Sequence, residues 1–226
     1  MKFNKLILIT SAILAFSMFI IKGDAINLSM SSETSTKTFK EKKPDILLVN
    51  NDNKIGSYKP KELRTLDVEF IDDTIKEEKQ LEKVAADALE KLFKTAKEEE
   101  SINFLATSGY RSYKTQKETY IKRVIAQGKK KAEEYVAIPG ISEHQTGLAI
   151  DVTNEDRWFV ESTKEAQWLA ENAHRFGFII RYPKGKETIT GKKYEPWHIR
   201  YVGKDIAKDI FEKGVTLEEY VENKAI

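Results

Sequence analysis

Apolar residues recur at three- and four-residue spacing in three stretches of the chain, which is the pattern of helices with one buried face. The longest stretch covers residues 73–100, the second covers Lys114–Gln127 and the third covers residues 164–176. The apolar positions of the first stretch are Leu81, Val84, Ala85, Ala88, Leu89, Leu92 and Phe93. Gly128 and Gly177 follow the second and third stretches, where glycine commonly ends a helix. We therefore expect three amphipathic helices.

Short runs of apolar and β-branched residues lie between and after these helices and predict strands. The runs are Phe104–Ser108, Leu148–Val152, Phe178–Arg181 and Trp197–Val202. A further run, Ile46–Val49, is followed by four polar residues, the pattern of a strand that ends in a turn and the expected start of the folded domain. Short strands among helices, without an internal repeat, indicate an α+β fold.

The N-terminal residues have the three-part pattern of a secretory leader. Lys2 and Lys5 precede the apolar run Leu6–Ile21, and the small residues Gly23 and Ala25 follow it. This run is near the lower end of the membrane-spanning range of about 17–25 residues, so it could also remain as an anchor. The small residues favour cleavage. We expect residues 1–25 to be a signal peptide, and the mature protein to be extracellular, in the cell wall or at the outer face of the cytoplasmic membrane.

The rest of the chain divides into a linker and one domain. Residues 26–44 are rich in Ser, Thr and Lys and poor in apolar side chains, a composition that predicts a disordered linker. Residues 45–226 are then expected to form one domain, because a chain of 226 residues has room for a sizeable core besides the leader and linker.

Charge and cysteine content narrow the function. The 38 basic and 36 acidic residues are interleaved and leave a net charge of +2, so no single-sign field favours nucleic acid, and we expect no nucleic-acid binding. The chain has no cysteine, which excludes disulfides, thiolate nucleophiles and cysteine-based zinc sites. Any metal ion must therefore be held by histidine and carboxylate side chains.

Two of the three histidines stand in informative surroundings. The first segment is SEHQTGLAID, where bulky residues alternate with Ala149 and Asp151. A strand there would direct the bulky side chains into the core and Asp151 to the opposite face. Gly147 and Ala149 would leave that face open, so His144 in the preceding loop could reach a metal ion beside Asp151.

The second segment is YEPWHIRYV, in which Pro196 disfavours a helix interior and His198 alternates with bulky residues. Two imidazoles and one carboxylate suit zinc and leave a fourth position open to water, as in catalytic sites. Zinc can lower the pKa of such a water to about 7. Glu195, just outside the expected strand, could take a proton from that water and pass it to a leaving amine.

A third segment, SGYRSYKTQ, follows an expected strand and enters a helix. The forked guanidinium of Arg111 could bind a substrate carboxylate or stabilise an oxygen that gains charge, although a surface ion pair is the alternative. Gln116 and Ser142 could hydrogen-bond a peptide, but both residue types are also common in caps and turns. His174 has no carboxylate or glycine pattern around it and is assigned to helix structure or surface.

Together these motifs resemble the VanY-type D-alanyl-D-alanine carboxypeptidases, within a wider group that includes lysostaphin-like peptidases and the hedgehog signalling domain. SGYRS, SEHQTGLAID and EPWH occur in the expected order, over roughly residues 46–202 with a motif core at about 75–203. The resemblance implies a small α+β fold with a central antiparallel sheet. It also implies the following roles: one zinc ion bound by His144, Asp151 and His198, Glu195 as catalytic base, Arg111 as a catalytic and substrate-binding residue, and Gln116 and Ser142 in the substrate pocket.

The resemblance further implies a zinc metallopeptidase that removes the terminal D-alanine from peptidoglycan stem peptides, with zinc and Arg111 stabilising the oxyanion. An L,D-carboxypeptidase acting on tetrapeptide stems and a wall endopeptidase remain open, and the loops Ala132–Ile141 and Lys184–Tyr194 are expected to decide among them. A non-catalytic, zinc-containing wall-binding domain is a further alternative, which the presence of Glu195 disfavours. We expect a monomer that contacts membrane only through an uncleaved leader.

Overall fold

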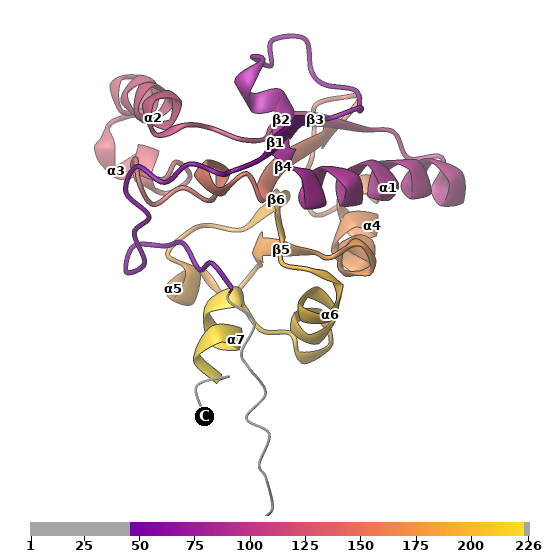
Figure 1. The fold of residues 1–226 in the computed structure, drawn as a ribbon. Coiled ribbons are helices and arrows are strands. Elements are labelled where there is room, and N and C mark those ends of the chain that lie inside the picture. The colour runs from indigo at the N-terminus through magenta and orange to yellow at the C-terminus, as the bar shows by residue number, and fades with distance from the viewer. Residues whose placement is uncertain (1–45, 224–226) are drawn as a thin grey trace, which may run out of the picture. The chain divides into compact units, whose positions relative to one another are not determined.

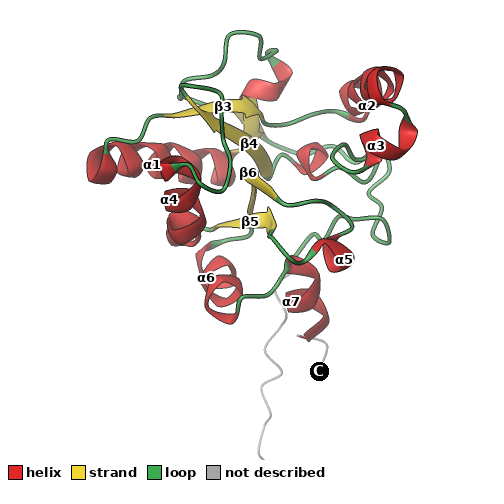
Figure 2. Ribbon diagram, turned by 180° about the vertical axis from the view of Figure 1, so that it is seen from behind, coloured by secondary structure: helices red, strands yellow, loops and turns green. Residues whose placement is uncertain are grey.

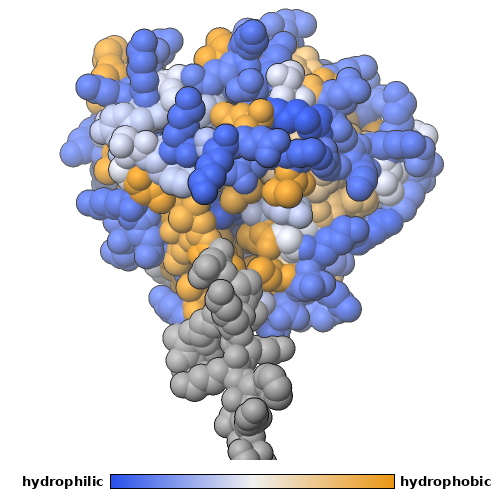
Figure 3. Space-filling model, in the orientation of Figure 1, coloured by the Kyte–Doolittle hydropathy of each residue, from blue (hydrophilic) through white to orange (hydrophobic). Residues whose placement is uncertain are grey.

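The computed structural model describes residues 46–223, so the expected signal peptide and linker lie outside the described residues. Within the described range, no helix combines the length and the apolar character needed to cross a bilayer. On the face shown in Figure 3, hydrophilic residues cover most of the surface, as the interleaved charges of the sequence require.

A four-stranded antiparallel sheet forms the centre of the described chain, with strand order β3-β4-β6-β5 (Figure 1). Its strands are β3 (Phe104–Ser108), β4 (Ala149–Asn154), β5 (Phe178–Tyr182) and β6 (Glu195–Tyr201). A separate antiparallel pair consists of β1 (Leu63–Thr65) and β2 (Gln80–Glu82). This arrangement confirms the expected α+β fold with a small central antiparallel sheet.

Helices cover the sheet on both sides. Figures 1 and 2 show α1 and α4 on one side, and α2 and α3 on the other. The α-helices are α1 (Lys83–Glu100), α2 (Tyr113–Gln127), α3 (Lys129–Glu133), α4 (Lys164–Asn172), α5 (Glu187–Thr190), α6 (Lys204–Lys213) and α7 (Leu217–Asn223). Residues 46–223 also contain three short 3₁₀ helices: η1 (Glu77–Lys79), η2 (Glu143–Thr146) and η3 (Ala173–Phe176).

The main core lies between α1, α4 and one face of the sheet. Leu89 and Leu92 of α1 and Leu169 of α4 are fully buried there, against Ile150 of β4 and Ile199 of β6. Burying each such side chain contributes about 1.5–3 kcal/mol. Because side chains alternate along a strand, β4 and β6 send their other side chains to the opposite, polar face of the sheet.

A smaller apolar cluster joins the C-terminal helices to the other face of β5. Ile179 packs there with Ala207 and Ile210 of α6 and with Leu217 and Tyr220 of α7. The N-terminal segment that includes Ile46 and Leu48 packs against the same cluster.

Several expected elements differ from the structure. The first helix begins at Lys83 rather than at residue 73, because residues 77–82 form η1 and β2 instead. Leu81 still reaches the core, but it does so from β2, and Val84 points to solvent with 54% of its surface exposed. Ile46–Val49 forms no strand, although Val49 is buried.

The other elements lie close to their predicted ranges. The strand Phe104–Ser108 has the predicted bounds, and the second helix begins one residue early, at Tyr113. The third stretch divides into α4 and η3, and Gly177 ends it with a φ of 88°, a conformation that glycine adopts without strain.

Candidate active site

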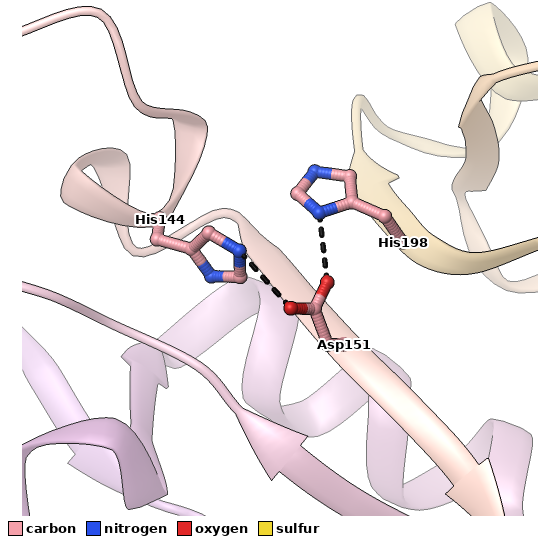
Figure 4. A group of neighbouring side chains, drawn as sticks. All are labelled: His144, Asp151 and His198. Carbon is pink, nitrogen blue, oxygen red and sulfur yellow. Dashed lines mark hydrogen bonds and ion pairs between the residues drawn. The ribbon is translucent and has the colours of Figure 1, made fainter. Parts of the chain in front are cut away.

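His144, Asp151 and His198 lie together on the polar face of the sheet (Figure 4). Asp151 of β4 and His198 of β6 are directly opposite in the antiparallel register, and His144 reaches them from η2. Asp151 Oδ1 is 2.8 Å from His198 Nδ1, and Asp151 Oδ2 is 3.4 Å from His144 Nε2. One potential ligand atom from each residue lies within 4.8 Å of the others, so the three can hold one metal ion.

The backbone turn after β3 sets the orientation of His144. Nδ1 of His144 is 2.8 Å from the carbonyl oxygen of Gly109, which lies in this turn. A carbonyl can only accept, so Nδ1 carries the hydrogen and the lone pair of Nε2 points towards Asp151. In a metal-binding histidine, the ring nitrogen that does not bind the metal usually donates a hydrogen bond to a backbone carbonyl or a carboxylate. Burial lowers the pKa of His144, which favours the neutral form that binds a metal.

His198 presents its other nitrogen, Nδ1, to the same point. Burial disfavours its imidazolium form, but hydrogen bonds to Asp151 and Glu143 outweigh burial and raise the pKa of His198 to about 9. Because zinc binds neutral imidazole, metal binding must displace the proton that His198 shares with Asp151. Two converging imidazoles and one carboxylate therefore fit a zinc ion and leave room for one further ligand.

Glu195 is the first residue of β6 and pairs with Tyr182 of β5, so its predicted place just outside the strand is wrong. Its side chain is buried, with 4% of the residue exposed, and it lines the same cavity as the histidines. Burial raises the pKa of Glu195 to about 7. A carboxyl group with this pKa can both accept and return a proton near neutral pH.

Three side chains contact the guanidinium of Arg111 within 3 Å, and Asp151 Oδ2 lies 3.7 Å from its Nη2. Its Nε lies 2.9 Å from Ser108 Oγ and 2.9 Å from Glu78 Oε1, and its Nη1 donates to Gln116 Oε1 at 2.9 Å. The amide nitrogen of Gln116 donates to the carbonyl of Ala137. Both ends of the fully buried Gln116 amide are therefore engaged, and its oxygen helps to position Arg111.

All of the predicted site residues line one cavity of about 180 Å³ between the sheet and α2. Those residues are Arg111, Gln116, Ser142, His144, Asp151, Glu195 and His198. The wall also includes Tyr135, Val136 and Ala137 after α3, and Lys192 before β6. His174 lies outside this cavity and stacks on Phe211 with ring centroids 3.9 Å apart, in keeping with its assignment to helix structure.

The structure also changes the role expected of Gly147. Its φ is +69°, and an added Cβ would lie 3.0 Å from Leu63 Cδ2 and 3.2 Å from the backbone nitrogen of Glu82. The close approach of β1 and β2, rather than space for a metal ion, therefore requires glycine there.

Sequence reasoning missed two carboxylates near the site, the partly buried Glu78 and the fully buried Glu143. Glu78 pairs with Arg111, and Glu143 lies beside His198 with its side chain completely buried. Each occurs in a charged or loop-forming stretch that reads as solvent-exposed. The arginines that pair with them would have indicated their burial. These arginines belong to strands or turns that are distant in the sequence, so no local sequence pattern connects them with the two carboxylates.

The family model for VanY, described as D-alanyl-D-alanine carboxypeptidase, matches residues 78–204. The chain is 48% identical over 172 residues to YodJ of Bacillus subtilis (strain 168), covering 74% of this chain and 63% of that protein. It is 39% identical over 191 residues to a D-alanyl-D-alanine carboxypeptidase of Enterococcus faecalis, covering 80% and 67%. The chain thus spans just under two thirds of the length of YodJ.

Two solved structures share the fold. The LdcB LD-carboxypeptidase is 47% identical with a TM-score of 0.71, and the match covers 77% of this chain and 84% of that one. A variant of the D,D-pentapeptidase VanY from a VanB-type resistance cassette, in complex with Zn(II), is 37% identical with a TM-score of 0.65, covering 77% and 97%.

Proposed function

The chain belongs to the VanY family of D-alanyl-D-alanine carboxypeptidases, and on this premise we propose that it is a zinc metallopeptidase that removes the terminal D-alanine from peptidoglycan stem peptides. The convergence of His144, Asp151 and His198 with Glu195 in one cavity is the observation that carries the proposal. The solved VanY relative in complex with Zn(II) supports zinc as the ion.

The residues of the cavity can divide the hydrolysis among them. Zinc, held by His144, Asp151 and His198, would supply Lewis acidity at the scissile carbonyl and at the attacking water. Glu195 takes a proton from the water while the water oxygen bonds to the carbonyl carbon. When the C–N bond breaks, Glu195 gives that proton to the amine of the departing D-alanine. Arg111 offers a fixed cation to the substrate carboxylate or to the developing oxyanion.

An L,D-carboxypeptidase is a second candidate, and a specific observation favours it. The chain is 47% identical to LdcB and to the Streptococcus pneumoniae L,D-carboxypeptidase DacB, against 37% for the D,D-pentapeptidase VanY. The two activities differ in the residue that precedes the terminal D-alanine. Tyr135–Ala137 and Lys192, from the two loops expected to decide specificity, line the cavity and can contact that residue.

The setting of the enzyme is also part of the proposal. The leader pattern of residues 1–25 supports export, with membrane contact only if the leader is retained. We propose that the exported protein acts as a monomer in the cell wall. A non-catalytic wall-binding domain is disfavoured, because a structural zinc site has no need of a buried base such as Glu195 beside it.

Release of D-alanine from synthetic stem peptides tests the activity. Purified protein should release D-alanine from a pentapeptide stem, a chelator should abolish release, and added zinc should restore it. Release from a tetrapeptide stem alone would establish the L,D-activity instead, and cleavage of a cross-linked dimer without loss of D-alanine would establish an endopeptidase. Release from none of these substrates would refute the proposal.

Glu195→Ala tests the assignment of the base. The variant should bind one zinc ion per chain but lose at least about 100-fold in kcat, the lower range for a general acid–base group. Loss of zinc together with activity would show that Glu195 is a ligand rather than the base.

A further inference from the structure

Glu143, the residue before the metal ligand His144, is the centre of a buried charge network. Its side chain has no exposed surface. Glu143 Oε1 accepts hydrogen bonds from Arg181 Nε and Arg200 Nη1, both at 2.7 Å. Its other oxygen, Oε2, lies 3.5 Å from His198 Nε2. The carboxylate therefore stands directly behind the second metal-binding imidazole, on the side away from Asp151.

The network extends to both ends of the described chain. Arg181 donates from Nη1 and Nη2 to the two oxygens of Glu218 in α7, at 2.9 and 2.6 Å. Arg200 Nη2 donates to the backbone carbonyl of Leu47 at 2.7 Å. Asn50 Nδ2 donates to Glu218 at 3.2 Å. Leu47, Asn50 and Glu218 all lie outside residues 78–204, the part of the chain that the family model matches.

The position of these charges argues for more than stability. Two arginines and two glutamates balance one another, but burying a charge costs several kcal/mol even when it is paired, and well-packed apolar residues often stabilise a fold as well or better. The apolar contacts of Leu217 and Tyr220 already attach α7 to the sheet. The network instead ends at Nε2 of His198, where a fixed carboxylate affects which ring nitrogen carries the hydrogen.

That consequence is the tautomer and direction of His198. When zinc displaces the proton that Nδ1 shares with Asp151, the carboxylate at Nε2 keeps a hydrogen on that second nitrogen, so the lone pair of Nδ1 is directed at the metal position. Metal-binding histidines commonly donate their second N–H to a carboxylate in this way. Arg181 and Arg200 fix where Glu143 stands, and Glu218 fixes Arg181.

We infer that Glu143 and Glu218 are positioning residues for the zinc ligand His198, and that α7 completes the metal site from outside the matched region. The inference rests on the zinc site of the proposed function but not on the substrate. It predicts that a change in α7, at the far end of the network, weakens zinc binding.

The test is the zinc affinity of the full chain, measured by competition with a chromophoric chelator. Glu143→Gln should raise the zinc dissociation constant about 10–100-fold, the usual effect of losing a carboxylate behind a metal ligand. Glu218→Gln should raise it less, by up to about tenfold, because Arg181 keeps its bond to Glu143. If Glu143→Gln does not fold, Glu218→Gln remains the decisive variant.

Glu99→Gln is the matched control. Glu99 accepts a bidentate pair from Arg175 at 2.6 and 2.8 Å, the same pairing as Arg181 with Glu218, but this pair is exposed and joins α1 to η3 away from the cavity. The zinc affinity of the Glu99→Gln variant should equal that of the wild type.

Nitrogen NMR of the zinc-loaded protein gives a second readout, in which the Nε2 proton of His198 should exchange faster in Glu218→Gln than in Glu99→Gln.

The outcomes separate the two proposals. If the wild type binds zinc and both network variants bind it equally well, the positioning role is wrong and the proposed function stands. The positioning role is also wrong if Glu99→Gln weakens zinc binding as much as Glu218→Gln does. A wild-type chain that binds no zinc would contradict the zinc site itself, and the proposed function would fail first.

Discussion

Glu195 combines two properties that a general base needs, access to the cavity and a pKa close to neutrality. Burial is the main cause of its raised pKa, and the neighbouring charges act in opposite directions. His198, Lys192 and Arg111 lower the pKa, whereas Asp151 raises it. Lys192 is held near the cavity by a hydrogen bond of 2.8 Å from its Nζ to the carbonyl of Glu133.

This balance predicts the acid limb of the pH profile. Glu195 must be ionised to take a proton, and its pKa is about 7, so kcat/KM should fall roughly tenfold per pH unit below that value. A bound zinc dication favours the carboxylate, so the limb of the zinc enzyme should lie at or below pH 7. Lys192→Gln removes a cation that lowers the pKa of Glu195, and the limb should move to higher pH.

Lys193→Gln is the control for this experiment. Lys193 is the next residue, but its Nζ pairs with Glu134 at 2.7 Å and its side chain is exposed. The profiles of the two variants are compared over pH 5–8 with the same stem peptide. A limb that stays in place in Lys192→Gln, or moves equally in Lys193→Gln, would contradict the electrostatic account.

At this scale, the sequence predicted the residues whose position follows from strand alternation. Asp151 and His198 face away from the core as the spacing required, and they meet because β4 and β6 are neighbours. Glu143 could not be predicted in the same way. Its burial depends on Arg181 and Arg200, which belong to two strands whose pairing no local pattern specifies.

Among the elements, the turn after β3 has a decisive role, because it contacts η1 and β2 and holds His144. Gly109 donates its N–H to the carbonyl of Glu78 at 2.7 Å, and Tyr110 donates to that of Gln80 at 2.8 Å. A Cβ on Gly109 would lie 2.7 Å from the carbonyl oxygen of Glu78 and 2.6 Å from that of Gln80. Such distances leave no room for a side chain, so the backbones must move apart if one is added.

Gly109→Ala should therefore disturb both the fold and the metal site. We expect a loss of about 1–3 kcal/mol in the free energy of unfolding, the usual cost of overpacking. The carbonyl of Gly109 orients His144, so the zinc dissociation constant should also rise, by about tenfold. Denaturant unfolding and chelator competition measure the two effects.

Gly185→Ala provides the comparison. Gly185 has a φ of 80° with nothing within 4 Å of an added Cβ, so alanine there should cost about 1–2 kcal/mol in backbone strain and leave zinc affinity unchanged. Wild-type zinc affinity in Gly109→Ala would show that the turn does not set the orientation of His144.

The elements were predictable to different degrees for physical reasons. Apolar alternation and a glycine stop define β3 and α2 locally, so the sequence places both almost correctly. The start of α1 depends on a tertiary contact. Leu81 continues the helical spacing, but its backbone pairs with Arg64 in β1, and this pairing overrides the local preference.

At the scale of the whole molecule, the metal site joins two ligands of one motif to a third, His198, which lies 47 residues beyond Asp151. His144 lies in η2, Asp151 in β4 and His198 in β6, and each is supported by backbone or side chains from other segments. In the unfolded chain these ligands are separated, so zinc binds the folded form much more strongly. Zinc binding and folding are therefore coupled.

This coupling predicts that a chelator lowers the melting temperature. At a free zinc concentration about 100 times the dissociation constant, the ion adds about 2.7 kcal/mol to the stability of the folded state. For a domain of this size, about 2–4 °C per kcal/mol gives a fall of roughly 5–10 °C in Tm when zinc is removed. Differential scanning calorimetry with and without chelator measures the shift.

Two histidine variants show whether the shift arises at the proposed site. His144→Gln removes a ligand, so its Tm should not respond to zinc or chelator. His174→Gln changes the histidine outside the cavity and should keep the full shift, whatever its own stability. If His174→Gln loses the shift, or His144→Gln retains it, zinc stabilises the chain somewhere else. If the wild type shows no shift at all, the three ligands do not hold zinc in the folded protein.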